Sequence, residues 1–415
     1  MSRWRDWAAT QTRRVHDAGR WRAPRDLDAA GPTGTLAPDG TPVVSFASND
    51  YLGLTRHPAV IAAAHAALDR WGSGAGSARL IVGSRPVHSE LERALADWRR
   101  TEAAVLFPTG FAANLGVLTT FGGPDVLVCS DALNHASIID GCRMSRAEVT
   151  VYRHADPEHV GHLLAEAPGR RAVVVSDTVF SMDGDVAPVE ALAEVCARHG
   201  ALLVLDDAHA VLGPDPDLDG VDALRVGTLS KALGSLGGFV AGPRAFTDLV
   251  VNRARSYIFT TASTPADAAA ALAALGVVRS SEGDALRARL RDNIDRVRPG
   301  HPSPIVPVVV GDEVATVAVA DALLARGLLV PAIRPPTVAP GTCRLRVALS
   351  AAHSPEQVDA LVGALHELLD APFGPRADAT PATPPATPPA VPPAVPPAVP
   401  PAVPPAAAVG PGVAP

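Results

Sequence analysis

Short apolar runs alternate with helical segments along the middle of the chain. Apolar runs of four or five residues without a polar interruption are typical of strands buried on both faces of a parallel sheet. Repeated units of strand and helix predict a mainly parallel sheet that helices cover on both faces. The expected strands are residues 103–107, 126–129, 171–175 and 201–205, and the expected helices are residues 58–71, 89–99, 112–121 and 189–199.

The pattern changes beyond Gly242, which predicts a second, smaller domain. Residues 244–282 are dominated by helix formers, and short strands at 305–310 and 345–350 lie around a helix at 314–326. We therefore expect an α/β fold with a large, mainly parallel-sheet domain and a smaller α+β C-terminal domain. The expected parts are an N-terminal arm or helix over 1–45, the large domain over 46–284, the small domain over 285–372 and a tail over 373–415.

The tail has a composition of its own. From Ala377 onward the chain repeats Ala-Thr-Pro-Pro and then Ala-Val-Pro-Pro, with no charged residue after Asp378. A segment without charged or aromatic residues and rich in proline cannot pack a core, so we expect it to be extended or disordered.

Composition and charge exclude several classes of protein. The 415 residues are 47% hydrophobic and 19% charged, as in a globular protein, and the net charge of −7 provides no basic surface for nucleic acid or an anionic membrane. The charged N-terminus lacks the apolar run of a signal peptide, and no uncharged stretch could span a bilayer, so we expect a cytoplasmic protein. The four cysteines form no C-x-x-C pair, which predicts neither a metal site nor a disulfide framework.

Polar groups with catalytic potential follow the strand at 201–205. This apolar run ends in Asp206-Asp207-Ala208-His209, at the carboxyl end of a strand, where open α/β sheets place their sites. Side chains alternate along a strand, so Asp206 and Asp207 should face opposite sides. A strand-end aspartate is often only a helix cap, and a lone histidine is more often structural than catalytic.

Lys231 is the only lysine of the chain, and it lies in the Gly/Ser-rich turn Gly227–Gly234. Every other basic side chain except histidine is arginine, which cannot lose its proton in a protein. A single lysine in such a turn indicates an amine that must deprotonate, as a Schiff base requires.

Two segments could bind an anion. Residues 108–112 join a strand through Thr109-Gly110-Phe111 to the start of a helix, where free backbone N–H groups and the helix dipole favour a phosphate. The loop Gly72–Arg79 could also cradle an anion, although such loops are commonly only connections. An acid at a strand end, a histidine, a lone lysine and a phosphate-binding helix start together predict a pyridoxal phosphate site.

Seven motifs in this order resemble the α-oxoamine synthases, which are fold-type-I enzymes dependent on pyridoxal 5'-phosphate. The resemblance extends from about residue 15 to 370 and excludes the proline-rich tail. The motifs are Ser-Asn-Asp-Tyr-Leu-Gly-Leu (48–54), Thr-Gly-Phe-Ala-Ala-Asn (109–114), Asn-His-Ala-Ser (134–137), Val-Phe-Ser-Met-Asp-Gly-Asp (179–185), Asp-Asp-Ala-His (206–209), Gly-Thr-Leu-Ser-Lys-Ala-Leu-Gly (227–234) and Ile-Arg-Pro-Pro-Thr (333–337).

The resemblance implies a role for each matching residue. Lys231 would bind the cofactor aldehyde and later move the Cα proton, and Asp206 would pair with the pyridine nitrogen. His209 would meet the ring hydroxyl, and His135 would stack on the ring and lie beside the substrate. The remaining implied contacts are Gly110, Phe111, Ser181 and Thr228 with the cofactor, and Thr337 and an N-terminal arginine, Arg20 or alternatively Arg22, with the substrate.

The resemblance also implies a reaction and an assembly. The expected reaction is a decarboxylative condensation of L-alanine with a pimeloyl thioester, carried by coenzyme A (pimeloyl-CoA) or an acyl carrier protein (pimeloyl-ACP), in a homodimer with active sites between subunits. The alternatives are a sister enzyme that joins glycine to acetyl-CoA and a noncatalytic partner subunit. The presence of Lys231 argues against the latter.

One segment departs from the family pattern. His209 is followed by Ala210-Val211-Leu212, where the family usually has glycine, and the loop from Pro214 to Gly220 is rich in Pro and Asp. We expect this loop to lie near the acyl entrance, where it would influence the acyl chain preference.

Overall fold

Seven strands form the main sheet of the computed structural model, which describes residues 2–213 and 215–369. The strand order is β4-β10-β9-β8-β7-β5-β6, and every neighbouring pair is parallel except the two that β10 makes, with β4 and β9. The expected mainly parallel sheet is confirmed. The strands are β4 (Ala103–Phe107), β5 (Val126–Asp131), β6 (Glu148–Tyr152), β7 (Arg171–Asp177), β8 (Leu202–Asp206), β9 (Ala223–Thr228) and β10 (Gly238–Gly242).

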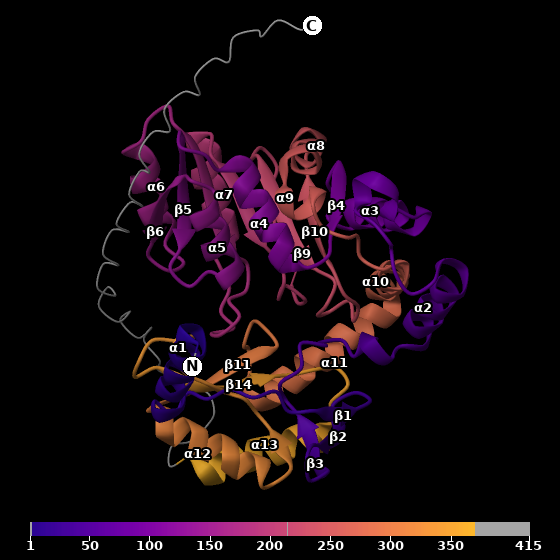
Figure 1. Ribbon diagram of the computed structural model, residues 1–415, viewed down its shortest axis with the longest axis vertical. Coiled ribbons are helices and arrows are strands. Elements are labelled where there is room, and N and C mark those ends of the chain that lie inside the picture. Colours follow the sequence, from indigo (N-terminus) through magenta and orange to yellow (C-terminus); the bar gives the residue numbers. More distant parts are fainter. Residues whose placement is uncertain (1, 214, 370–415) are drawn as a thin grey trace, which may run out of the picture. The chain divides into compact units, whose positions relative to one another are not determined.

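Helices cover both faces of this sheet because its strands are apolar on both sides (Figure 1). On β8, Val204 packs in the core on one face of the sheet, whereas Leu203 and Leu205 pack in the core on the other face. The helices of the two faces are α4 (Gly110–Phe121), α5 (Ala136–Met144), α8 (Arg244–Arg253) and α9 (Arg255–Ile258) on one side, and α6 (Pro157–Ala165) and α7 (Val189–His199) on the other.

A third and larger core connects the main sheet to the C-terminal part of the chain. It includes residues from β4 and β10, the helices α2 (Pro58–Trp71), α3 (Pro86–Trp98) and α10 (Pro265–Val278), and the C-terminal elements. Those elements are the helices α11 (Ser281–Val297), α12 (Glu313–Leu324) and α13 (Pro355–Leu368), and the antiparallel sheet β11 (Ile305–Gly311), β14 (Cys343–Ala348) and β13 (Ala332–Ile333). This smaller sheet and its helices agree with the expected α+β region, and the exact domain boundaries remain predictions.

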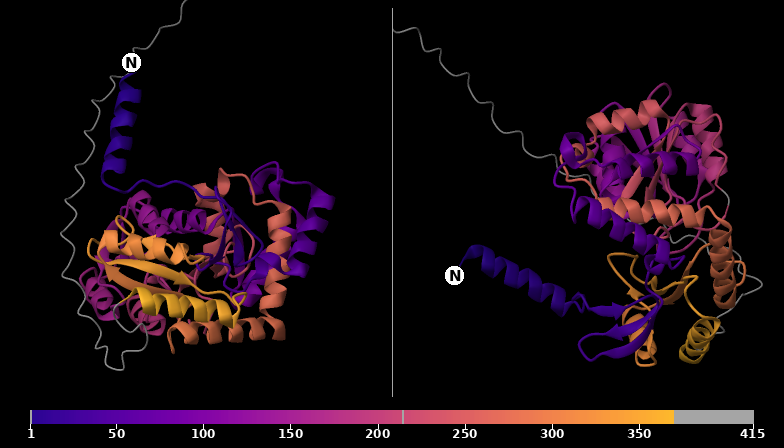
Figure 2. Two further views of the ribbon diagram at one scale, coloured as in Figure 1. Left: turned by 90° about the horizontal axis from the view of Figure 1, so that it is seen from below. Right: turned by 90° about the vertical axis from the view of Figure 1, so that its right-hand side faces the viewer.

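The N-terminal segment contributes a small sheet and one exposed helix. Strands β1 (Leu27–Ala29), β2 (Thr33–Leu36) and β3 (Thr41–Ser45) pair in order, and β3 also pairs with β12 (Leu328–Leu329). Helix α1 (Arg3–Asp17) buries no residue and extends away from the other elements in both views of Figure 2. The predicted tail over 373–415 lies outside the described residues.

Candidate active site

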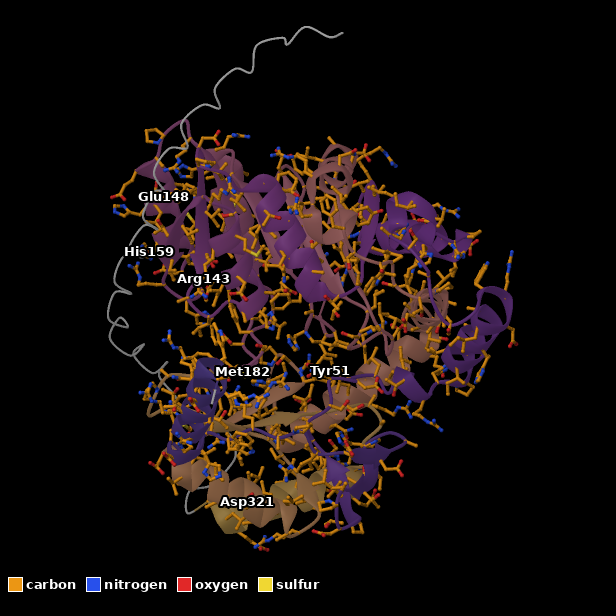
Figure 3. All side chains as sticks on the ribbon, in the orientation of Figure 1. Tyr51, Arg143, Glu148, His159, Met182 and Asp321 are labelled. Atoms are coloured by element: carbon orange, nitrogen blue, oxygen red, sulfur yellow. The ribbon has the colours of Figure 1, made fainter. Side chains whose placement is uncertain are left out.

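The carboxyl ends of neighbouring parallel strands bring polar side chains together. Strand β5 ends at Asp131, β7 at Asp177, β8 at Asp206 and β9 at Thr228. Asp177 and Asp206 are directly opposite each other in the register of β7 and β8. In Figure 3, Tyr51 and Met182 lie between the ribbons of the main sheet and of the smaller C-terminal sheet. The site therefore forms where these two parts of the chain meet.

Lys231 and His209 are in direct contact. Lys231 Nζ lies 3.1 Å from His209 Nε2, and His209 Nδ1 lies 2.6 Å from the hydroxyl of Tyr51. The Tyr51 hydroxyl donates its proton to Asn49 Oδ1 at 3.0 Å, so it accepts from His209 Nδ1–H. Burial lowers the pKa of His209 well below its usual range, so the ring is neutral and its Nε2 accepts a hydrogen bond from the Lys231 amine.

Burial shifts the pKa values of Lys231, His209 and Tyr51. Burial lowers the pKa of Lys231, against the opposing charges of Asp206 and Asp177. Burial also lowers the pKa of His209 well below its usual range, and the charges of Lys231 and Arg346 lower it further. For Tyr51, burial raises the pKa to about 12, so this hydroxyl remains protonated. Lys231 thus has an easier path to its neutral form than an exposed lysine.

The turn that carries Lys231 is fixed by its backbone. The Gly234 N–H donates to the Lys231 carbonyl at 2.9 Å, and Gly234 has a positive φ of 57°. A Cβ atom at Gly234 would lie 2.6 Å from the Thr55 backbone nitrogen, so only glycine fits there. The Leu229 N–H donates to the Gly237 carbonyl at 2.9 Å and closes the other side of the turn.

Asp206 and Asp207 point to different surroundings. Asp206 Oδ2 accepts a hydrogen bond from Asn114 Nδ2 at 2.6 Å, and its Oδ1 accepts from the Ala208 N–H at 2.9 Å. Asp207 instead forms a buried ion pair with Arg225, Oδ2 to Nε at 2.6 Å. Strand alternation explains the difference, because Asp206 shares the face of Val204 and reaches α4.

Asp177 is a second acid of the site that the sequence did not single out. Its carboxylate is buried, and no side chain of the described residues donates a hydrogen bond to it. Burial raises the pKa of Asp177 well above its usual range, and the neighbouring charge of Asp206 raises it further. Asp177 is therefore favoured in its protonated form.

His135 caps helix α5 and lies beside Phe111. Its Nδ1 accepts a hydrogen bond from the Ser137 N–H at 3.2 Å, and the Phe111 ring meets it edge-on with centroids 6.4 Å apart. His135 retains an exposed surface, yet the surrounding atoms partly desolvate the ring and lower its pKa, with Asp206 opposing and Lys231 reinforcing the shift. His135 is thus a neutral flat ring next to the Lys231 group.

The start of helix α4 lies against the end of β9. Thr109 caps the helix by accepting from the Ala112 N–H at 3.0 Å, and a Cβ atom at Gly110 would lie 3.3 Å from the Thr228 Cβ. Thr228 Oγ1 is 2.7 Å from Ser230 Oγ, a hydroxyl that the sequence did not indicate. A helix N-terminus with two adjacent hydroxyl groups suits a phosphate.

Ser181 lies in a loop that the smaller sheet holds. Its carbonyl accepts from Arg346 Nε at 2.5 Å, and Arg346 Nη2 donates to Asn49 Oδ1 at 3.2 Å. Arg344 pairs with Asp183 in the same loop. Arg346 therefore links the loop of Ser181 to the hydrogen-bonded group of Tyr51, His209 and Lys231, a connection without a local sequence signal.

Arg20 and Thr337 are each linked to Arg334, Arg20 through their shared partner Glu313 and Thr337 through its backbone. Arg20 pairs with Glu313 at 3.4 Å, and Arg334 Nη1 donates to the Gly19 carbonyl at 2.7 Å. The Thr337 N–H donates to the Arg334 carbonyl at 3.1 Å, whereas Arg22 is exposed. No contact connects Arg20 or Thr337 to Lys231 within the described residues.

The loop after His209 is anchored by Asp215. Its Oδ1 accepts from Arg99 Nη1 at 2.7 Å and from Arg225 Nη1 at 2.9 Å, next to the Asp207 ion pair. Asp215 is thus held beside the ion pair of Asp207 and Arg225.

No group of three or more His, Cys, Asp or Glu side chains in residues 2–213 and 215–369 is arranged to hold a metal ion. Over the same residues, no helix combines the length and the apolar character needed to cross a membrane.

Comparison with known proteins shows the family to which the chain belongs. The family model described as aminotransferase class I and II matches residues 41–365, so the chain belongs to this family. The structure is also similar to that of serine palmitoyltransferase from S. paucimobilis with a bound PLP-myriocin aldimine, with a TM-score of 0.81 and 31% identity over 88% of this chain and 96% of that one.

The sequence is also similar to 8-amino-7-oxononanoate synthases. That of Anaeromyxobacter dehalogenans (strain 2CP-1 / ATCC BAA-258) is 49% identical over 85% of this chain and 94% of its own. That of Methylobacterium sp. (strain 4-46) is 47% identical over 82% and 94%, respectively. A solved 8-amino-7-oxononanoate synthase from Francisella tularensis is 25% identical, with a TM-score of 0.65 over 78% of this chain and 96% of that one.

Proposed function

We propose that this chain is a pyridoxal phosphate-dependent acyltransferase that condenses L-alanine with a pimeloyl thioester. The products are 8-amino-7-oxononanoate, CO2 and the free thiol, in biotin synthesis. The relatives that match nearly the whole of their own length carry the name of this activity. The observation that carries the proposal is the placement of the only lysine against neutral His209, beside the acid Asp206.

The residues present fit pyridoxal phosphate. When bound, this cofactor supplies an aldehyde for an amine and a ring that takes up the electron pair left by a departing proton or CO2. Asp206 would hold the ring nitrogen, and the start of α4 with Gly110, Phe111, Thr228 and Ser230 would hold the phosphate. The buried carboxylate of Asp177, to which no side chain of the described residues donates a hydrogen bond, supports the presence of a polar group in this part of the site.

Lys231 would perform the proton chemistry, and the two histidines would position the cofactor. The lowered pKa of Lys231 favours the neutral amine, which can attack a carbonyl and then remove or return the Cα proton of the amino acid. His209 would meet the ring hydroxyl, since its Nε2 already accepts from the position of Lys231 Nζ. His135 would cover the ring face, and Ser181 would hydrogen-bond to the cofactor.

Arg20 and Thr337 would contact the substrate, with Arg22 as the alternative arginine. Both Arg20 and Thr337 adjoin Arg334, so the proposal places an anionic or polar part of the acyl substrate near this turn. The acyl carrier, coenzyme A or an acyl carrier protein, is left open by these contacts.

We also propose that the active enzyme is a homodimer with the site at the subunit interface. Helix α9 contacts both α4 and the segment Arg79–Gly83, and this region exposes large apolar side chains. Phe111, Ile81 and Phe259 are 43%, 73% and 69% exposed. Apolar residues gathered around a site favour burial against another surface. Sedimentation of the purified chain tests this, and a monomer at assay concentration would contradict it.

The reaction is tested by thiol release from the purified protein with pyridoxal phosphate. L-alanine, glycine and L-serine are each combined with pimeloyl, acetyl, succinyl and palmitoyl thioesters of coenzyme A, and with pimeloyl-carrier protein. We expect release with L-alanine and a pimeloyl thioester. Release only with glycine or L-serine would overturn the proposed substrates while retaining the class of reaction.

A further inference from the structure

Four side chains form a hydrogen-bonded series between His135 and Asp206. His135 Nδ1 lies 2.7 Å from Ser137 Oγ, Asn114 Nδ2 lies 2.9 Å from Ser137 Oγ, and the same Nδ2 lies 2.6 Å from Asp206 Oδ2. Asn114 is 1% and Ser137 0% exposed, so water does not compete for these bonds. Helices α4 and α5 bring Asn114 and Ser137 together by packing on one face of the sheet.

The donors and acceptors of this series have one consistent assignment. Asp206 Oδ2 only accepts, so the Asn114 amide turns its NH2 group toward it and gives its second hydrogen to Ser137 Oγ. The Ser137 hydroxyl then donates to His135 Nδ1, which also accepts from the Ser137 backbone N–H at 3.2 Å. A nitrogen that accepts from two donors carries no proton, so neutral His135 carries its proton on Nε2.

We propose that Asn114 and Ser137 are positioning residues that set the tautomer of His135 and the orientation of the Asp206 carboxylate through one shared relay. His135 then presents Nε2–H, away from the relay, to the amino acid substrate, whose carboxylate accepts it. This inference rests on the proposed condensation for the identity of the substrate. The state of the His135 ring rests only on the hydrogen bonds of the chain.

Replacing Ser137 and replacing Asn114 should have different consequences. Ser137 contacts His135 but not Asp206, so its loss should change the ring and spare the acid. Asn114 contacts Asp206 directly, so its loss should also weaken the hold of that acid on the cofactor. A merely structural role would lower stability in both variants and leave the His135 tautomer unchanged.

The first measurement is ¹⁵N NMR of the full-length holoenzyme labelled at histidine, with the His135 signal assigned by its absence in His135→Phe. We expect unprotonated Nδ1 and protonated Nε2 in the wild type, a mixture of tautomers in Ser137→Ala, and recovery in Ser137→Thr. Ser145→Ala is the matched control, because Ser145 is also buried, lies at the other end of α5, and donates its hydroxyl to the Cys142 carbonyl. A wild-type signal from Nδ1–H, or a Ser137→Ala spectrum identical to wild type, would overturn the proposal.

The second measurement separates binding from turnover. Ser137→Ala should raise KM for the amino acid roughly fivefold, the effect of one neutral hydrogen bond, with cofactor affinity unchanged. Asn114→Ala should also weaken cofactor affinity about tenfold. Unchanged KM and cofactor affinity in both variants would contradict the relay. If the wild type releases no thiol from any amino acid, the proposed function fails, and the NMR result still decides whether the relay exists.

Discussion

Replacing Asp207 with alanine should destabilise the fold without weakening cofactor binding. Asp206→Asn should instead weaken cofactor binding without destabilising the fold. Asp207 pairs with Arg225 at 2.6 Å, and the side chains of this pair are 0% and 4% exposed. Asp206 has no ion-pair partner within the described residues and contacts Asn114 and the Ala208 N–H. Adjacent identical residues therefore occupy a structural site and a candidate catalytic site.

The magnitude follows from the charges that remain. Removing one partner of a buried ion pair costs about 3–5 kcal/mol, because the other charge is left without compensation. In Asp207→Ala, Asp215 still contacts Arg225 at 2.9 Å but must also neutralise Arg99. We therefore expect Asp207→Ala to lose about 3 kcal/mol of its free energy of unfolding, the lower end of this range. In Asp206→Asn, the loss of a charged hydrogen bond to the ring nitrogen should weaken cofactor affinity about 10- to 100-fold.

Two assays on each variant separate the effects. Urea unfolding followed by circular dichroism gives the midpoint, and absorbance titration of cofactor-free protein with pyridoxal phosphate gives the affinity. Asp219→Asn, at an exposed position of the same loop, serves as control. Should Asp207→Ala fail to fold, Asp207→Asn retains an acceptor and should show a smaller shift. Reduced cofactor affinity at an unchanged midpoint in an Asp207 variant would refute the reasoning.

Three further predictions concern charged groups of the same region. Lys231→Ala should eliminate thiol release while the protein retains part of its cofactor affinity, and normal turnover would contradict its role. Asp177 is favoured in its protonated form by burial, so its contribution to stability is present below its ordinary pKa of 3.8 and lost as the pH rises through the raised pKa. Asp177→Asn should therefore gain stability relative to wild type with rising pH, and parallel unfolding curves across pH 4–9 would refute this. Burial lowers the pKa of His154, but hydrogen bonds to Asp131 and Asp185 outweigh it and raise the pKa to about 10. Its stabilising effect is present below the ordinary pKa of 6.5 and lost toward pH 10, so His154→Gln should flatten this dependence of the unfolding midpoint.

Elements with strong local signals could be predicted to the residue. The helix at 58–71 begins with Pro58 after the capping His57, and the helix at 189–199 ends at Gly200, whose φ is 63°. The strand at 103–107 is an uninterrupted apolar run. Such signals lie within a few residues of the element that they define, so the sequence contains them in full.

Strand β9 was missed because its signal is not local. Its sequence Ala-Leu-Arg-Val-Gly-Thr places Arg225 in the middle of a buried strand, where an isolated charge would be excluded. The charge is tolerated only because Asp207 and Asp215 neutralise it. The loop after His209 also depends on distant partners, because Asp215 contacts Arg99 and Arg225, and its expected position near the acyl entrance stays a prediction.

The candidate site was predictable where each residue belongs to a motif and unpredictable where partners are distant. Alternation along β8 separates Asp206 from Asp207, and their contacts lie on different sides accordingly. Tyr51 is 158 positions from His209, and Arg346 is 297 positions from Asn49. Only tertiary packing brings such pairs together, and a single sequence contains no local pattern that indicates them.

The distribution of basic residues has a physical explanation that connects the core to the site. Arg225 is almost fully buried yet must remain charged to balance Asp207 and Asp215, and arginine retains its proton in such surroundings where lysine would not. Lys231 occupies the one position where burial should have the opposite effect and release the proton. Neither residue type could therefore replace the other. A lysine at position 225 would tend to lose the charge that balances Asp207 and Asp215. An arginine at position 231 would keep a charge that prevents attack on a carbonyl.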